Sequence, residues 1–154
     1  MKKKPYSTAT REVRNAEIHP KFIKYLKEYA GLYKLGDLEK DIQHCFISTN
    51  QKKGFLGGLK TNHTVVCFTT EFLFWGIMYD NKESGIGAAN WTEISEIRDW
   101  ETSEMSALVE AHGVEILCFM YQASRRSRSF IALDQSTAGQ RCRELLKERI
   151  TGKK

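Results

Sequence analysis

The stretch Thr64–Trp75, TVVCFTTEFLFW, decides the fold. It contains two runs of β-branched and aromatic residues, which are typical of strands, joined by Thr69-Thr70-Glu71. A connection between parallel strands needs about a dozen residues or more. The short connection therefore predicts that the two runs form an antiparallel hairpin.

Similar apolar and aromatic runs continue on both sides of this hairpin. Short turns separate them, such as His112-Gly113, where Gly readily takes a positive φ. Trp91–Ile94 is predicted as one helical turn ahead of a strand that ends at Trp100, and a later turn is placed at Arg125–Arg128. The expected strands are residues 43–49, 64–69, 71–79, 85–89, 95–100, 105–111, 114–122 and 129–133.

Amphipathic helices flank the strands. Residues 19–36 begin with His19-Pro20 and place apolar residues at every third or fourth position, with lysines on the opposite side. After the capping residues of Asp134–Thr137, a terminal helix is expected, with one apolar face made of Ala138, Cys142, Leu145, Leu146 and Ile150. The predicted fold class is mainly β with flanking helices. It is a bent antiparallel sandwich or partly open barrel of about seven strands, capped by the C-terminal helix and preceded by an extra N-terminal helix.

The composition suits one globular domain. The chain has 154 residues, of which 41% are hydrophobic and 28% charged, and this excludes collagen-like, disordered and disulfide-scaffold classes. No apolar run approaches the roughly 20 residues that span a bilayer. Residues 1–60 carry 13 Lys and Arg against 6 Asp and Glu, whereas residues 61–154 carry 11 against 13. The net charge of +5 therefore comes from the first part of the chain and suggests an anionic partner.

The domain organisation follows from these segments. Residues 1–18 are expected as a flexible basic arm, because Lys2, Lys3 and Lys4 precede polar residues rather than the apolar run of a secretory signal. Residues 19–36 form the helix packed on the domain, 43–150 the sandwich and 151–154 a disordered tail. The four cysteines lack a C-x-x-C pair, which predicts reduced core residues and a cytoplasmic protein.

Taken in order, the segments resemble the pleckstrin-homology-like superfamily, in its bacterial and GRAM-like forms. The similarity lies in Thr64–Trp75, in Trp91–Ile97 (WTEISEI) and in the closing strands and helix of Val114–Ile150, and it covers residues 43–150. The resemblance implies an adaptor that binds phosphoinositide headgroups, proteins or peptides and catalyses nothing. The lipid-binding pattern has an Arg two residues after the downstream basic residue of the first loop. Here Asn62 follows Lys60, which argues against specific phosphoinositide capture.

The resemblance places binding cations in the loop between the first two strands, residues 50–63, and this loop also carries apolar residues. Lysines beside apolar side chains suit an interface with anionic lipid, where each Lys contributes roughly 1 kcal/mol. The arginine turn suits phosphate or carboxylate groups through paired donors. The alternative is that the apolar residues pack on the domain and the cations are only solvated. The candidate ligand-binding residues are Lys52, Lys53, Lys60, Arg125, Arg126 and Arg128, and the candidate membrane or partner contacts are Phe55, Leu56 and Leu59.

The function predicted from these features is a binding or adaptor module. It would dock on an anionic membrane surface or an acidic protein, as a cytoplasmic protein peripheral to the membrane. The alternative is a protein-interaction domain that uses a sheet edge or the Trp91/Trp100 region. A nucleic-acid-binding role is less favoured because the aromatic residues lie in strands, where the core needs them. No catalytic residue, metal site or cofactor is expected, since His44-Cys45 and His63…Cys67 lack a metal-ligand spacing.

Overall fold

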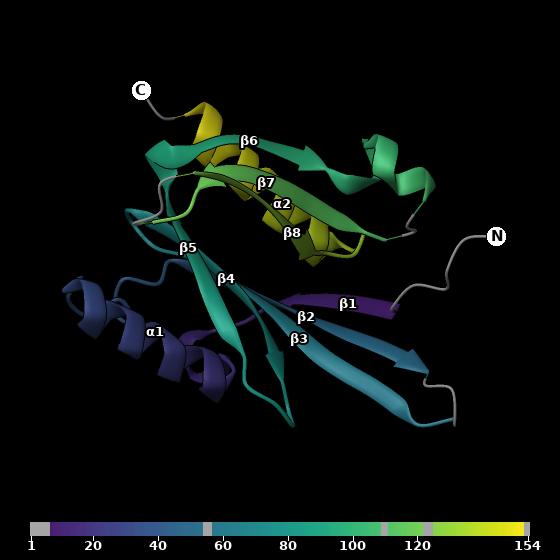
Figure 1. Ribbon diagram of the computed structural model, residues 1–154, viewed down its shortest axis with the longest axis horizontal. Helices are drawn as coiled ribbons and strands as arrows, with labels where there is room; N and C mark the ends of the chain where they lie inside the picture. The colour runs from purple at the N-terminus through teal and green to yellow at the C-terminus, as the bar shows by residue number, and fades with distance from the viewer. Residues whose placement is uncertain (1–6, 54–56, 109–110, 122–124, 153–154) are drawn as a thin grey trace.

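The computed structural model describes residues 7–53, 57–108, 111–121 and 125–152. Within them, eight strands form two antiparallel sheets, on which two α-helices pack (Figure 1). The first sheet has the spatial order β1 (Ser7–Glu12), β2 (His44–Lys53), β3 (Leu59–Phe68), β4 (Phe72–Tyr79) and β5 (Gly85–Asn90). The second sheet has the order β6 (Ile94–Asp99), β7 (Gly113–Phe119) and β8 (Arg126–Ala132). The helices are α1 (Pro20–Tyr33) and α2 (Thr137–Thr151).

The hairpin predicted from Thr64–Trp75 is confirmed. β3 and β4 are antiparallel neighbours, with Phe68 opposite Leu73. The Thr69 backbone N–H donates to the Phe72 carbonyl at 2.9 Å, and the Thr69 hydroxyl donates to the same oxygen at 3.0 Å. Because Thr69 is buried, these hydrogen bonds satisfy its N–H and its hydroxyl and fix the turn.

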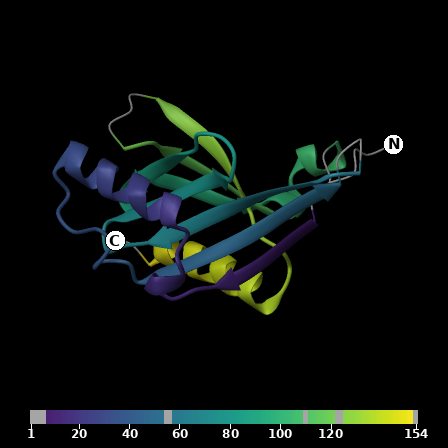
Figure 2. The ribbon, with the colours of Figure 1, turned by 90° about the horizontal axis from the view of Figure 1, so that it is seen from below.

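β3 is buried on both faces over its second half, which explains its continuous apolar sequence. Val66 and Phe68 belong to an inner core between the two sheets, whereas Val65 and Cys67 belong to an outer core beneath α1. Figures 1 and 2 show α1 on the side of the first sheet that faces away from the second sheet. The helix residues buried in the outer core are Phe22, Leu26 and Ala30.

α2 closes the inner core between the sheets. Its N-cap is Ser136, whose hydroxyl accepts a hydrogen bond from the Gly139 N–H. Cys142 and Leu146 are fully buried among residues of both sheets. The predicted fold class is confirmed: the protein is mainly β, with a C-terminal helix and a second helix near the N-terminus, and its sheets are not closed into a barrel. In the part of the chain that the structure describes, neither helix has the length and apolarity needed to cross a bilayer.

The expected flexible arm over residues 1–18 differs from the structure at residues 7–12, which form β1. This strand pairs with β2, with Thr10 opposite Ser48 and a hydrogen bond of 2.8 Å between their hydroxyls. Within β1, all of which is described, Thr10 is the only buried residue. A strand held by backbone pairing and polar contacts has no hydrophobic period that a sequence pattern could reveal.

The strand predicted over residues 105–111 is wrong at residues 105–108, because residues 104–107 form a short 3-10 turn that follows another at residues 100–102, while residues 109 and 110 lie outside the described part of the chain. Met105 and Leu108 are exposed, so the apolar residues that suggested a strand are not part of the core. The Ser106 hydroxyl donates to the Ser103 carbonyl at 2.7 Å, a local bond that favours the turn over a strand. β7 therefore pairs with β6 and β8.

Candidate functional site

The β2–β3 hairpin carries the three lysines predicted to bind an anionic partner. The predicted loop over residues 50–63 is mostly strand, because β2 continues to Lys53 and β3 begins at Leu59. The outer part of this hairpin diverges from the second sheet (Figure 1). We call residues 50–53 and 59–63, together with the β4–β5 turn at residues 80–84, the projecting end. Phe55 and Leu56 lie outside the described residues.

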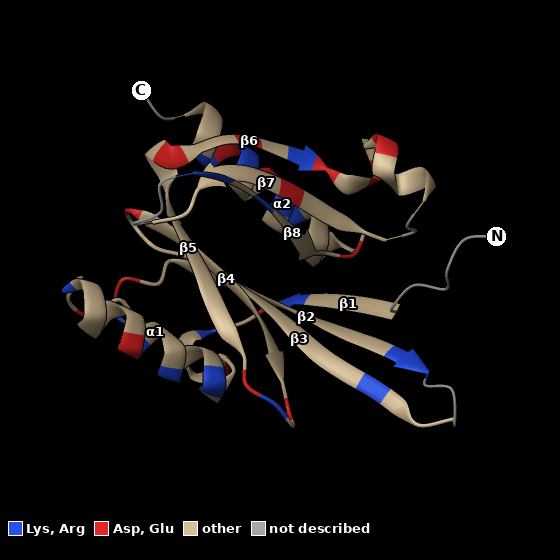
Figure 3. Ribbon diagram, viewed as in Figure 1, with Lys and Arg blue, Asp and Glu red and all other residues tan. Residues whose placement is uncertain are grey.

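Lys52 and Lys60 lie directly opposite each other on neighbouring antiparallel strands. Residues in this relation share a face of the sheet, with Cβ atoms about 4.5–5.5 Å apart. The next pair places Lys53 opposite Leu59 on the other face, and Leu59 is 64% exposed. The basic end of the hairpin is visible in Figure 3. The end of the hairpin therefore carries Lys52 and Lys60 on one face, and Lys53 with the exposed Leu59 on the other.

A ladder of polar side chains supports this hairpin on the face that Lys52 and Lys60 share. Asn50 donates to the Asn62 side-chain oxygen at 2.8 Å and to the Thr64 hydroxyl at 2.9 Å. Thr8 on β1 donates to the Asn50 side-chain oxygen at 2.9 Å. Asn50 and Thr64 are buried, so the inner face is polar here and hydrogen-bonded. The ladder connects three strands next to the lysines, on the same face of the sheet.

A shallow groove of about 550 Å³ lies between the start of β3 and the β4–β5 turn. Lys82 Nζ lies 4.1 Å from the centre of the Tyr79 ring, a cation–π contact that holds this ammonium at the groove. With Lys60 and Asp80 also in its wall, the groove has more positive than negative charge. Its lining residues are Leu59, Lys60, Thr61, Asn62, Tyr79, Asp80, Asn81 and Lys82.

Two histidines and an aspartate meet at the projecting end, where α1 begins. One candidate ligand atom from each of His19, His63 and Asp80 lies within 4.8 Å of the others. The ring centres of His19 and His63 are 5.4 Å apart. Burial, and next the proximity of His63, lowers the pKa of His19. Sequence reasoning missed this group because its members are far apart in the chain and match no spacing motif.

The predicted arginine site is divided between different surroundings. Arg126 and Arg128 belong to β8 rather than to a turn, while Arg125 is exposed just before the strand. Arg128 Nε lies 3.6 Å from the carboxylate of the buried Glu115, and Arg126 lies 5.7 Å from the Phe119 ring centre. Figures 1 and 2 place the start of β8 and the tip of the β2–β3 hairpin at opposite ends of the long axis. The arginines and the lysines therefore do not share one surface.

The two tryptophans of the predicted contact region also have different roles. Trp91 is buried in the inner core, and its indole N–H donates to the Thr69 carbonyl at 3.0 Å. Trp100 is half-buried and meets the ring of Phe130 edge-on, with 5.2 Å between ring centres. Trp91 is thus a core residue, whereas Trp100 borders an exposed aromatic residue of β8.

The other histidines and the cysteines are separated from one another. His44 Nδ1 lies 3.6 Å from the Glu12 carboxylate, while its neighbour Cys45 belongs to the outer core, with its sulfur 3.1 Å from that of Cys67. All four cysteines are described, and all are buried free thiols, as predicted. Burial raises the pKa of the Cys118 thiol to about 11, which keeps it protonated at neutral pH.

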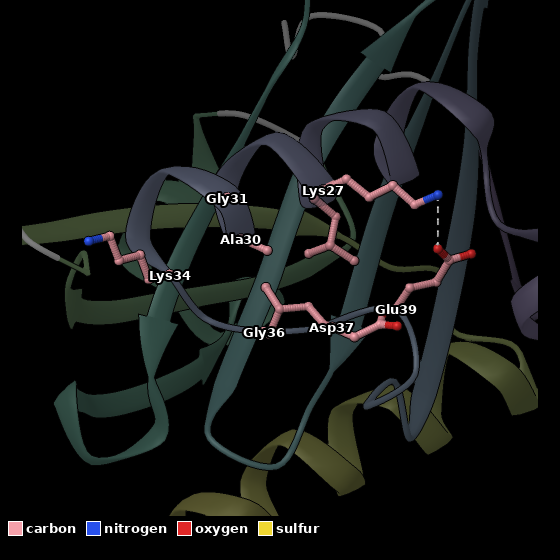
Figure 4. A pocket seen from close by; sticks show the side chains of 9 residues that line it. Lys27, Ala30, Gly31, Lys34, Gly36, Asp37 and Glu39 are labelled. Atoms are coloured by element: carbon pink, nitrogen blue, oxygen red, sulfur yellow. Dashed lines mark ion pairs between the residues drawn. The ribbon is translucent and has the colours of Figure 1, made fainter.

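A second open groove, of about 510 Å³, lies between α1 and the segment that follows it (Figure 4). Lys27 Nζ makes an ion pair of 3.3 Å with Glu39 across it. Lys34 and Asp37 add one further charge of each sign to the lining. Because these charges balance, this groove has no preference for an anionic or a cationic ligand. The projecting end, in contrast, carries more positive than negative charge.

The chain matches no known family model, curated protein or solved structure. Its function must therefore be inferred from the chemistry of its own surface. At the projecting end, that chemistry consists of the opposed lysines, the exposed Leu59, the basic groove and the group of two histidines and an aspartate.

Proposed function

We propose that the protein is a non-enzymatic binding module that docks on an anionic membrane surface through its projecting end. The observation that carries this proposal is the pair Lys52 and Lys60, directly opposite each other on neighbouring strands. Like charges in this position are unfavourable. A surface with many negative charges would relieve their repulsion, and the pair is therefore suited to such a partner.

The neighbouring residues fit the same role. Leu59 is largely exposed beside Lys60, so it can enter the apolar part of a lipid interface while the lysines stay at the headgroups. Lys53 adds a third cation at the same tip, and Lys82 a fourth at the adjoining groove. The polar ladder behind them keeps the hairpin stiff, so little conformational freedom is lost on docking.

The proposal includes a distant relation to the pleckstrin-homology-like superfamily and a cytoplasmic location peripheral to the membrane. Asn62 stands where the lipid-binding pattern has an Arg, and its side-chain oxygen accepts the hydrogen bond from Asn50. We therefore propose attraction to negative surface charge in general, without selection of one phosphoinositide headgroup.

The test is flotation of the untagged full chain with phosphatidylserine-containing vesicles and with phosphatidylcholine vesicles. We expect binding to the anionic vesicles alone, and this binding should weaken as salt screens the charges. Each Lys is worth roughly 1 kcal/mol near such a surface, so Lys52→Ala combined with Lys60→Ala should weaken binding about 30-fold.

The matched control is Lys24→Ala combined with Lys27→Ala, which removes two exposed lysines from α1. We expect this variant to lose far less affinity than the hairpin variant. Equal loss in both variants, equal binding to neutral vesicles, or no binding at low salt would each contradict the proposal.

A second candidate function is a protein contact at β8. This strand lies at the edge of the second sheet and carries Arg126, Arg128 and Phe130 on one face, and Phe130 is 41% exposed. An acidic segment with an apolar residue could extend the sheet there. Affinity purification should then recover a stoichiometric partner that Phe130→Ser loses. Recovery of no such partner would count against this candidate.

A further inference from the structure

We propose that His19, His63 and Asp80 form a binding site for a divalent transition-metal ion. The proposal is independent of membrane docking, because it uses none of the lysines of the hairpin. It rests on the convergence of three separate segments on one small region: the N-cap of α1, the middle of β3 and the turn that follows β4.

The register of the first sheet brings two of the donors together. His63 lies opposite Met78, so these two residues share a face of the sheet, and Asp80 follows two residues after Met78, just past the end of β4. Met78 belongs to the outer core, which identifies this face as the one that α1 covers. The start of α1 therefore brings His19 to the same place.

The separations suit a metal ion. Bonds of about 2.0–2.2 Å to Zn²⁺ in a tetrahedral arrangement place the ligand atoms roughly 3.3–3.6 Å apart. The three donor atoms already lie within 4.8 Å of one another, so the widest separation must close by at most about 1.5 Å. Asp80 is exposed, and a rotation of its side chain can supply part of that movement.

The hydrogen bonds around the histidines define how they would bind. His63 Nδ1 lies 3.3 Å from the Thr49 hydroxyl, which can accept a hydrogen bond from Nδ1–H and so leave the Nε2 lone pair for the ion. A metal-bound histidine usually donates its second N–H in this way. His19 differs, because its Nδ1 accepts the Lys21 N–H as the cap of α1.

Metal binding by His19 must therefore release this cap. A neutral imidazole that accepts at Nδ1 carries its proton at Nε2, and neither nitrogen can bind an ion until that arrangement changes. The Lys21 amide becomes a specific reporter of occupancy. The Lys21 ammonium keeps the β4–β5 turn next to the helix throughout, because it donates to the carbonyls of Tyr79 and Lys82.

The donor set selects the class of ion. Two imidazoles and one carboxylate suit Zn²⁺, Co²⁺, Ni²⁺ or Fe²⁺, whereas Mg²⁺ and Ca²⁺ prefer sets made of oxygen alone. Three protein ligands leave at least one coordination position for water or an added ligand. The site would also join α1 to the first sheet, so the ion should stabilise the folded protein.

The first test is titration of the untagged full chain with Zn²⁺ by calorimetry, with Co²⁺ absorption as a spectroscopic check. We expect one ion per chain, with tetrahedral or five-coordinate Co²⁺ bands. Since the loss of outer-shell partners alone typically costs 10–100-fold, His63→Ala and Asp80→Asn should each weaken Zn²⁺ binding at least tenfold.

His19 needs a variant that preserves the helix start. His19→Asn removes the imidazole, while Asn is a favoured N-cap residue. It should also lose at least tenfold in affinity and keep the circular dichroism of the original chain. His44→Ala and Glu83→Gln are the controls, since they remove a histidine and an acidic residue from outside the group and should bind as the original chain does.

The second test follows the Lys21 amide in nitrogen-15 NMR spectra during the titration. A shift of this signal at one equivalent of Zn²⁺, absent in His63→Ala, would support release of the cap on metal binding. The proposal is overturned if the original chain binds no Zn²⁺, if the three ligand variants bind it unchanged, or if His44→Ala loses as much affinity as they do.

Discussion

Two regions of the molecule arrange their charged side chains in opposite ways. Beneath α2, the guanidinium of Arg143 is almost fully buried and donates to the carboxylates of Asp99 and Glu101. At the projecting end, Lys52 and Lys60 stand directly opposite each other. The first region joins opposite charges in the interior, whereas the second places like charges side by side near the surface.

The first arrangement stabilises the fold, whereas the second is suited to a binding partner. The Arg143 guanidinium also donates to the carbonyls of Gly113 and Leu133, and Lys147 donates to Asp99 at 2.7 Å. This group, which we call the α2 cluster, fixes the terminal helix to the second sheet. The lysine pair, in contrast, places like charges directly opposite each other, an arrangement that is unfavourable for a hairpin. Such a cost is typical of surfaces that serve a partner.

Removal of Arg143 should cause the largest change in the free energy of unfolding. Arg143→Met keeps much of the side-chain volume but leaves two carboxylates without their buried partner. We expect the free energy of unfolding to fall by about 3–5 kcal/mol, as for other broken buried ion pairs. Urea denaturation at pH 7 measures the change. Lys147→Met is the control and should cost under about 1 kcal/mol, because the Lys147 side chain is 44% exposed; equal losses would contradict the distinction.

The second largest effect should come from acid, which weakens the α2 cluster. Burial alone would raise the pKa of Glu101, but the hydrogen bonds from Arg143 outweigh it and lower the pKa to about 2. The folded pKa lies below the ordinary value of 4.5, so the stabilisation is complete above that pH and is lost as the pH falls towards 2.

We expect the loss from Glu101 to be about 2 kcal/mol, after allowance for its partial exposure to solvent. Urea unfolding of the original chain and of Glu101→Gln between pH 7 and pH 2.5 tests this. The variant should be less stable at pH 7, and the gap between the two chains should close as the pH falls. A gap that stays constant with pH would show that Glu101 does not titrate as described.

The same contrast explains which parts of the fold could be predicted from the sequence. Thr64–Trp75 is apolar on both faces and has a short polar turn, so its periodicity and composition predicted the hairpin. The helical turn and strand after Asn90 were predicted correctly for similar reasons: the structure has a 3-10 turn at Trp91–Glu93 and then β6. Elements that bury apolar side chains leave a pattern in the sequence.

Polar elements left no such pattern. β1 contributes Thr10 and Thr8 to hydrogen bonds rather than apolar contacts, and it resembled a loose arm. Residues 105–111 are apolar enough to suggest a strand, but over residues 104–107 the backbone forms a turn that Ser106 stabilises. His19, His63 and Asp80 come together only through the register of β3 with β4 and the position of α1, neither of which is local information.

Replacement of one lysine of the opposed pair should have the smallest effect and the opposite sign. Lys60→Thr removes the like charge facing Lys52 and introduces a favoured strand residue, so the protein should become more stable by about 0.2–0.5 kcal/mol. Lys53→Thr provides the control for strand preference, because Lys53 faces Leu59 rather than a second lysine. The advantage of Lys60→Thr over Lys53→Thr should disappear in 1 M salt, where the screening length falls to about 3 Å. If Lys60→Thr is instead the less stable of the two at low salt, the lysine pair imposes no cost, and its value as an argument for an anionic partner is lost.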